Sequence, residues 1–316
     1  MSNFLKTIPV PICGLILGLV SLGNLLKDQH LVLLGNSIGA IGILLMVFIL
    51  AKVFFLFKHT TQGLKDPIVA SVSPTFTMAL MVICTYFVQF QAIAGLVRYV
   101  WLLAVVVHFV LMGYFIYHHL AKPQVKIHDV YPSWFIVFVG IGVISVTAGK
   151  FYPSLGQVIF WVALVLYLAL LPIVLKRVLK VEMAEPTLPL ITIIAAPGSL
   201  CLTGYMKSFT GQSMLLVVGL LILSQILYLG VLGRVIKLLK LPFYPSYAAF
   251  TFPLVITATA LTSVNGFLTA AGYHYVLLDA LEIIECAGAF LMVLYVLIRY
   301  IGFLININRT VVVTAK

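Results

Sequence analysis

The sequence has 316 residues, of which 63% are hydrophobic and only 9% are charged, and its mean hydropathy is +1.20. Charged residues make up about a quarter of an ordinary soluble domain, so this composition excludes a soluble protein and indicates an integral membrane protein. The formal net charge of +11 comes from 19 Lys and Arg residues that lie between hydrophobic segments. That distribution is typical of membrane topology signals, so no nucleic-acid partner is expected.

Ten apolar segments are long enough to cross a lipid bilayer as helices. In chain order they cover approximately residues 8–26, 31–57, 68–90, 94–119, 132–149, 156–175, 187–206, 213–236, 246–268 and 273–303. Successive segments pair as five helical hairpins. The sequence therefore predicts an all-α membrane protein with a single transmembrane domain over residues 1–316, ending in a short cytoplasmic tail at residues 304–316.

The linkers between these segments alternate in charge. Those after the second, fourth, sixth and eighth spans are basic, as in KHTTQGLKDP, whereas the others are short and nearly neutral. If the basic linkers and both termini lie on one side, that side carries 15 of the 19 Lys and Arg residues. By the positive-inside rule, we expect both termini in the cytoplasm of a protein of the plasma membrane.

Prolines recur in the odd-numbered spans, with spacings of 63, 58, 65 and 56 residues. They are Pro11, Pro74, Pro132, Pro197 and Pro253. A period near 60 residues predicts an internal repeat of helical hairpins, although prolines are also common in transmembrane helices generally. Because a break is tolerated where the backbone is buried or faces water, we expect a quasi-fivefold bundle whose inner odd helices are kinked and line a central pore.

Charged residues are absent from the odd spans between their ends, and Lys27, Lys150 and Lys207 come at the outer ends of spans one, five and seven. Positive charge at a pore mouth raises the local anion concentration and repels cations. The alternative is that these lysines only fix topology at the interface. The helix breaks are compatible with both cations and anions, since freed carbonyls attract cations and helix N-termini attract anions.

Span ten differs from the others because it contains Asp279, Glu282 and Glu285, which share one side of the helix. An intramembrane carboxylate is costly and therefore a candidate site. His108 and Arg98 in span four lie at similar depths and are candidate partners of Glu285 and Asp279. The group is either a proton relay of a coupled carrier or a structural or subunit-interface network.

No arrangement of nucleophile, His and carboxylate typical of an enzyme is visible. The four cysteines lie singly in four apolar segments, without metal-ligand spacing. The glycines of GLILGLVSLG indicate a helix-packing face and not a phosphate-binding loop. We therefore expect no enzymatic activity, no cofactor and no metal site.

Five segments carry a resemblance to a known family. They are PVPICGLILGLVSLGN, DPIVASVSPTFTMAL, VYPSWFIVFVGIGV, APGSLCLTGY and YAAFTFPLVITATAL, in spans one, three, five, seven and nine. In this order and spacing the chain resembles the tellurite-resistance/dicarboxylate transporter family, which includes the bacterial TehA proteins and the plant slow-type guard-cell anion channels. The resemblance extends from about Pro9 to Arg299.

The resemblance implies a homotrimer in which each protomer has its own pore, plugged by a phenylalanine of the ninth span. Phe252 of FTFP matches that position, and Pro253 follows it. Phe250 and Phe252 are about 200° apart around a helix, so at most one of them points at the pore axis. The expected function is a passive channel or uniporter for chloride, nitrate or similar anions. The alternative is a proton-coupled carrier of tellurite, sulfite or a C4-dicarboxylate.

Overall fold

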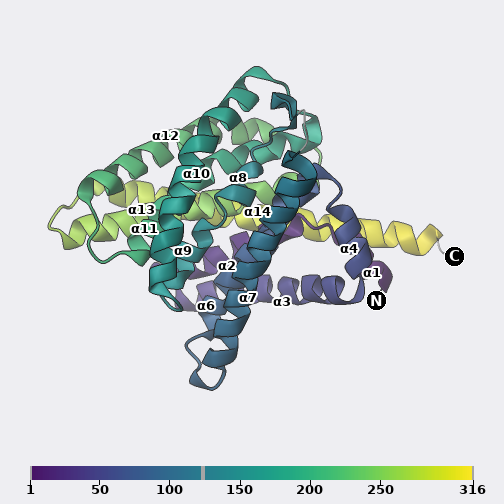
Figure 1. The fold of residues 1–316 in the computed structure, drawn as a ribbon, viewed down its shortest axis with the longest axis horizontal. Coiled ribbons are helices and arrows are strands. Elements are labelled where there is room, and N and C mark those ends of the chain that lie inside the picture. The colour runs from purple at the N-terminus through teal and green to yellow at the C-terminus, as the bar shows by residue number, and fades with distance from the viewer. Residues whose placement is uncertain (1, 122–124, 315–316) are drawn as a thin grey trace.

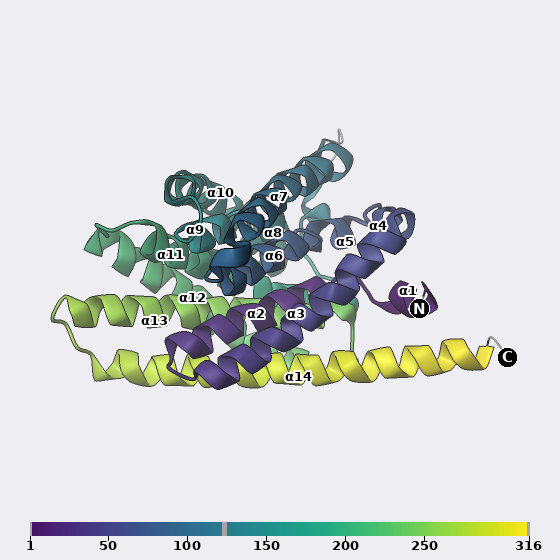
Figure 2. The same ribbon diagram turned by 90° about the horizontal axis from the view of Figure 1, so that it is seen from below.

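The computed structural model describes residues 2–121 and 125–314, and every regular element among them is helical. The first half contains α1 (Ser2–Thr7), α2 (Ile12–Asp28), α3 (Val32–Phe55), α4 (Phe57–Gly63), α5 (Pro67–Val72), α6 (Thr75–Phe87), α7 (Gln91–Phe115), η1 (Ile116–Leu120), η2 (Ile127–Asp129), α8 (Trp134–Phe138) and α9 (Gly142–Ala148). The second half contains α10 (Pro153–Lys180), η3 (Glu185–Ala195), α11 (Ala196–Ser208), α12 (Met214–Leu238), η4 (Pro245–Phe250), α13 (Phe252–Ala270) and α14 (Val276–Thr314). Both termini lie at the same end of the molecule (Figures 1 and 2).

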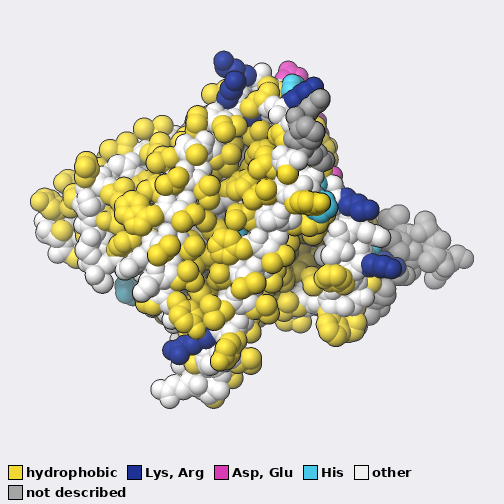
Figure 3. Space-filling model, in the orientation of Figure 1, with side chains coloured by type: hydrophobic (Ala, Val, Ile, Leu, Met, Phe, Trp, Pro, Cys, Tyr) yellow, Lys and Arg dark blue, Asp and Glu magenta, His cyan; other side chains and the backbone are white. Residues whose placement is uncertain are grey.

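Eight helical segments in the described residues are long and apolar enough to cross a membrane, so the chain is a multi-pass membrane protein. These segments differ in burial. Those containing α6, η3–α11 and η4–α13 are 72%, 94% and 78% buried over their most apolar stretch, whereas α3, α7, α10, α12 and α14 are only 28–33% buried. Hydrophobic side chains cover the molecular face in Figure 3. The protein therefore has an inner set of buried helices and an outer set that faces lipid.

Two of the ten predicted spans fall short of a full crossing as single helices. Helix α2 has 17 residues, equivalent to about 26 Å against a hydrocarbon core of about 30 Å. The segment 134–148 is divided into α8 and α9. Both segments are mostly buried, so they lie with the inner set. Eight helical segments of the described residues have the length and composition to cross a membrane, and the total of ten stays a prediction.

The inner helices contact one another in a closed cycle that runs α2, α6, α9, α11, α13 and back to α2. Each of them also packs against the exposed helix that follows it, as α2 does on α3 and α13 does on α14. Figure 2 shows the second of these pairs side by side at one edge of the molecule. Segments far apart in the sequence, such as α2 and α13, are thereby brought together around one centre.

The five prolines of the odd spans lie at or near the starts of helices. Pro74 separates α5 from α6, and Pro197 and Pro253 lie in the first turns of α11 and α13, where a missing amide hydrogen removes no helical bond. Pro11 directly precedes α2. Pro132 precedes α8 and does not interrupt it; the break in that segment lies between α8 and α9, at residues 139–141.

Glycines permit the close crossing of α2 over α3. A Cβ atom added to Gly23 would lie 2.5 Å from the Gly35 carbonyl oxygen and would also meet the Tyr86 hydroxyl. That hydroxyl donates a hydrogen bond to the Val20 carbonyl over 2.6 Å, so it is held in place. Close backbone approach of this kind is the usual role of glycines in membrane helix packing.

Gly23→Ala is therefore expected to lower the thermal unfolding temperature, because the added methyl group meets backbone that cannot move aside. Overpacking of this kind costs about 1–3 kcal/mol. The matched control is Gly219→Ala in α12, where an added Cβ meets nothing within 4 Å. Unfolding of both variants in the same detergent provides the test, and equal unfolding temperatures would contradict the prediction.

Candidate functional site

A small cavity lies at the centre of the inner helices, at the end of the protein where both termini are found. We call it the inner cavity; its volume is about 50 Å³. Its walls come from the starts of α2, α6, α8, α11 and α13, and three of the predicted prolines, Pro11, Pro197 and Pro253, line it. The cavity is thus formed by all five odd-numbered segments of the sequence.

The walls of the inner cavity are almost entirely apolar. Thr75 and Ser246 contribute hydroxyl groups to the lining. Both hydroxyls donate to backbone carbonyls, Thr75 to Val72 over 2.6 Å and Ser246 to Pro186 over 2.5 Å. No ionisable side chain lines this cavity among the described residues, so it contains no group that would bind an ion tightly.

A second and larger cavity lies beyond the first, between the C-terminal ends of the same inner helices. We call it the outer cavity; its volume is about 560 Å³. Its lining includes Lys27, Lys150 and Lys207, the three lysines that the sequence analysis singled out, together with Asp28. Three positive charges against one negative charge give this cavity a positive potential, which attracts anions.

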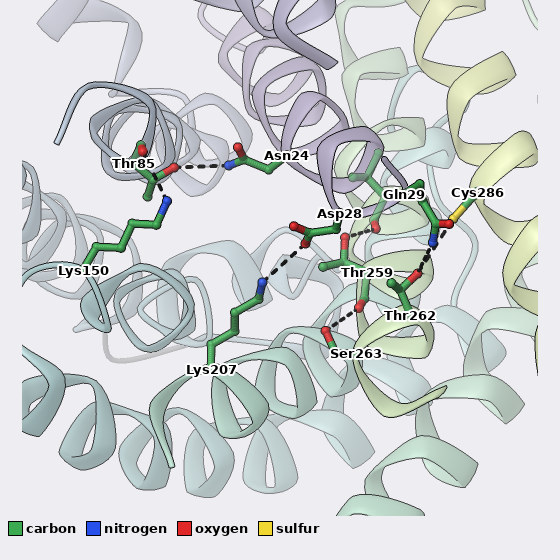
Figure 4. Close-up of polar contacts among 11 residues, drawn as sticks. Asn24, Asp28, Gln29, Thr85, Lys150, Lys207, Thr259, Thr262, Ser263 and Cys286 are labelled. Atoms are coloured by element: carbon green, nitrogen blue, oxygen red, sulfur yellow. Dashed lines mark hydrogen bonds and ion pairs between the residues drawn. The ribbon is translucent and has the colours of Figure 1, made fainter. Parts of the chain in front are cut away.

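Each of the three lysines is held by a different contact. The Lys207 ammonium lies 3.4 Å from an Asp28 carboxylate oxygen, and both side chains are nearly half exposed. The Lys150 ammonium donates to the Thr85 carbonyl over 3.4 Å, and the Lys27 ammonium lies 3.6 Å from the centre of the Tyr86 ring. Figure 4 shows Lys150, in the turn after α9, directed to Thr85 and Lys207 of α11 directed to Asp28. The charges are therefore gathered around one opening.

Phe252 lies where the two cavities meet. It lines both of them, as does Leu200 of α11, and only 8% of the Phe252 side chain is exposed. Two apolar side chains, Phe252 and Leu200, thus lie where a small apolar cavity meets a wide charged one. The structure thus places the predicted gate residue on the line that connects the two cavities.

The backbone beside Phe252 is fixed by contact with α2. Thr251, at the break between η4 and α13, has φ −91° and ψ −82°. Its hydroxyl lies within hydrogen-bonding distance of two carbonyls, that of Ala248 at 2.7 Å and that of Gly14, 237 positions away, at 3.0 Å. A Cβ atom added to Gly18 would lie 2.6 Å from the Thr251 Cβ and 3.2 Å from the Phe252 nitrogen. The position of the phenyl ring therefore depends on glycines in the first long helix.

Phe250 has a different environment, although it is only two residues from Phe252. Its side chain is fully buried, and its ring packs edge-to-face against Tyr247 at a centroid distance of 5.0 Å. It lines neither of the two cavities. Of the two phenylalanines, only Phe252 lines the central cavities, and the two residues lie on either side of the break at Thr251.

Two of the carboxylates of α14 form a polar cluster with α13 and the end of α2. The Asn265 amide donates to Asp279 over 2.8 Å and to Glu282 over 2.7 Å. Glu282 also accepts a hydrogen bond from Gln29, and Asp279 lies 3.1 Å from the His274 ring. This cluster ties α14 to its neighbours and lines neither the inner nor the outer cavity.

Glu285 is the deepest of the three carboxylates. Its side chain is 3% exposed and lies beside the Gln225 amide of α12. One of its carboxylate oxygens has no hydrogen-bond partner in the described part of the chain. It also lines neither of the two central cavities. Glu285 therefore lies between outer and inner helices, away from the central axis.

The pairing of these carboxylates with His108 and Arg98 is wrong. The His108 ring is fully buried in α7 and its Nδ1 atom is 2.8 Å from the Thr77 hydroxyl of α6. Arg98 is exposed on the same helix. The physical reason is that α7 packs on α6, whereas α14 packs on α13 and α2, so equal depth in the membrane did not bring these residues together.

Asp28, Leu200 and Gly18 are site residues that the sequence analysis missed. Asp28 follows Lys27 directly, and an acidic residue beside a mouth lysine is the signal that could have identified it. Gly18 lies in the glycine-spaced stretch that was assigned to helix packing, which is correct, but its contact at Thr251 could not be foreseen. Leu200 carries no sequence signal, because it is one leucine among many in the spans.

Comparison with known proteins agrees with this architecture. Residues 8–301 match the family described as voltage-dependent anion channel, so the chain belongs to that family. The resemblance drawn from the five segment motifs is confirmed. The chain is also 27% identical over 261 residues to an uncharacterized transporter of Methanocaldococcus jannaschii, covering 73% of this chain and 74% of the relative.

Proposed function

We propose that the protein is a passive anion channel or uniporter for chloride, nitrate or similar small anions, and that Phe252 is its gate. The observation that carries this proposal is the meeting of the inner and outer cavities at Phe252, with three lysines lining the outer one. An anion would be concentrated at the lysines and then pass the phenyl ring along the axis of the inner helices. Membership of the family supports anions as the transported class.

The lining of the path favours passive conduction. Lysines lie at the wide outer end, and the narrow inner part contains no group of opposite charge that would trap an anion. Conduction requires sites that attract an ion without holding it, and a hydrophobic constriction can close a pore by excluding water. The inner cavity, at about 50 Å³, and the apolar ring of Phe252 fit a closed, dewetted state of such a pore.

The same proposal includes the topology and assembly predicted from the sequence. Ten spans in a quasi-fivefold arrangement would place the outer cavity outside the cell and both termini in the cytoplasm of a plasma-membrane protein. The common end of the two termini and the closed cycle of inner helices support this arrangement. The homotrimer is proposed from the resemblance.

The function is tested by reconstituting the purified protein into liposomes and measuring flux and reversal potential. Chloride, nitrate and a C4-dicarboxylate are supplied in turn at two pH values. A channel is expected to give a reversal potential that follows the Nernst potential of the small anion at both pH values. Uptake that instead requires a pH gradient and saturates, without current at the anion potential, would overturn the proposal in favour of a coupled carrier.

The Glu285→Gln variant distinguishes a passive channel from a proton-coupled carrier that uses Glu285. Because Glu285 lines neither central cavity, we expect the variant to conduct small anions with the same reversal potential and pH response as the wild type. The glutamine keeps the shape and the contact with Gln225, so folding should be retained. Loss of transport in a folded variant would instead assign proton handling to Glu285.

A further inference from the structure

A third cavity lies away from the central axis, between the first two hairpins of the chain. We call it the lateral cavity; its volume is about 160 Å³, and its apolar walls include Val10, Ile49, Phe57, Phe76, Val107 and Leu111. Helices α3 and α4 supply one side, and α7 supplies the other. Among the described residues neither α3 nor α4 packs extensively against α7, so the gap between them is not closed by helix contact.

The polar side chains of this cavity are directed away from its interior. The hydroxyls of Thr60 and Ser73 donate to the carbonyls of Leu56 and Ala70, each within its own helical turn. Lys52 is 3% exposed, and its ammonium donates to the Ile8 carbonyl. An apolar cavity of about 150 Å³ stays dry and accepts apolar molecules. Water is therefore a poor occupant of the lateral cavity, and hydrocarbon is a suitable one.

The surroundings of the cavity are those of a bilayer. Phe54 and Phe57 at the end of α3 and the start of α4 are 80% and 64% exposed, and Val106 of α7 is 57% exposed. Figure 3 shows hydrophobic side chains over α7. The lateral cavity is thus bordered by exposed apolar side chains of the kind that contact acyl chains. Lipid would therefore lie next to the entrance of the cavity.

The start of α4 adds a position for a phosphate group. Lys58 and His59 are exposed directly after Phe57, at the end of the protein that bears both termini. Basic residues beside aromatic ones are typical of the level where headgroups meet hydrocarbon. A phospholipid held there would extend one acyl chain between α4 and α7 and its phosphate toward Lys58.

We propose that the lateral cavity is a binding site for one acyl chain of a membrane phospholipid. The chain would reach Ser73 and Phe76, on either side of Pro74, where α5 gives way to α6. A lipid at this point contacts the break in an inner helix without entering the central cavities. The inference does not depend on anion conduction and is tested separately from it.

The test uses the full protein in liposomes that contain a phosphatidylcholine with a photoactivatable group within one acyl chain. After irradiation, the labelled peptides are identified by mass spectrometry. We expect label on the segment 73–76, which an acyl chain reaches only by entering the lateral cavity. Val107→Trp, which fills the cavity, is expected to reduce this label several-fold. Val106→Trp, one residue away on the lipid-facing side, should leave it unchanged.

Leu111→Trp provides a second way to fill the cavity and should reproduce the loss of label. Thermal unfolding of each variant shows that the protein remains folded. Label confined to exposed positions of α4 and α7, with none on residues 73–76 of the wild type, would overturn the inference. Equal labelling of residues 73–76 in all folded variants would overturn it as well.

Discussion

Phe252→Ala is expected to raise anion conductance by about an order of magnitude or more, because it removes the apolar ring between two cavities that otherwise meet. Alanine leaves Pro253 and the first turn of α13 unchanged, so the path opens without loss of the inner helix. The measurement is single-channel or macroscopic current in planar bilayers at fixed anion gradients. Phe252→Leu should give an intermediate conductance, since a smaller apolar side chain blocks less of the path.

Phe250→Ala is the matched control for this experiment. It removes the same ring two residues earlier, but Phe250 is fully buried against Tyr247 and lines neither central cavity. We expect it to cost about 3–5 kcal/mol of stability, as Phe→Ala does in packed interiors, without opening the pore. If folded Phe252→Ala has unchanged conductance, or if both variants gain conductance equally, Phe252 is not the gate.

Replacing Lys27, Lys150 and Lys207 together by glutamine is expected to lower anion conductance and the preference for anions over cations. The three charges line one cavity, and their removal leaves Asp28 as its charged side chain among the described residues. Because exposed charges are screened over about 3 Å at 1 M salt and about 30 Å at 0.01 M, the loss should be large at low ionic strength and small at high. Conductance against salt concentration in the Phe252→Ala background measures the effect.

Arg98→Gln is the control for the lysine variant. Arg98 is exposed on α7 and does not line the outer cavity. A general effect of surface charge would make this variant resemble a single lysine replacement, whereas a local effect leaves its conductance unchanged. If the triple variant keeps the wild-type salt dependence and selectivity, the lysines serve topology alone.

Several features of the fold could be predicted from the sequence because they repeat along it. Apolar runs of spanning length identified the long helices, and the motif order identified the family. The positions of Pro74, Pro197 and Pro253 marked the starts of α6, α11 and α13, since proline fixes its own backbone locally. Pro132 does not mark the helix break in its segment in this way, because that break occurs at residues 139–141.

The side-chain partners could not be predicted in the same way. Depth in the membrane suggested His108 for Glu285, but depth says nothing about which helices are neighbours around the bundle. His108 contacts Thr77, while Glu285 lies beside Gln225. Asp279 and Glu282 share Asn265, a residue that has no unusual sequence context.

The sequence by itself therefore determined the membrane location, the helical class, the family and the residues that could form a mouth and a gate. The tertiary structure alone decided that Phe252, which the resemblance had singled out, lies where two cavities meet, and that the three lysines share one cavity. The physical reason is that composition and periodicity are local properties of the chain. The direction of a side chain after a helix break is set by distant contacts, such as the bond between Thr251 and Gly14 across 237 positions.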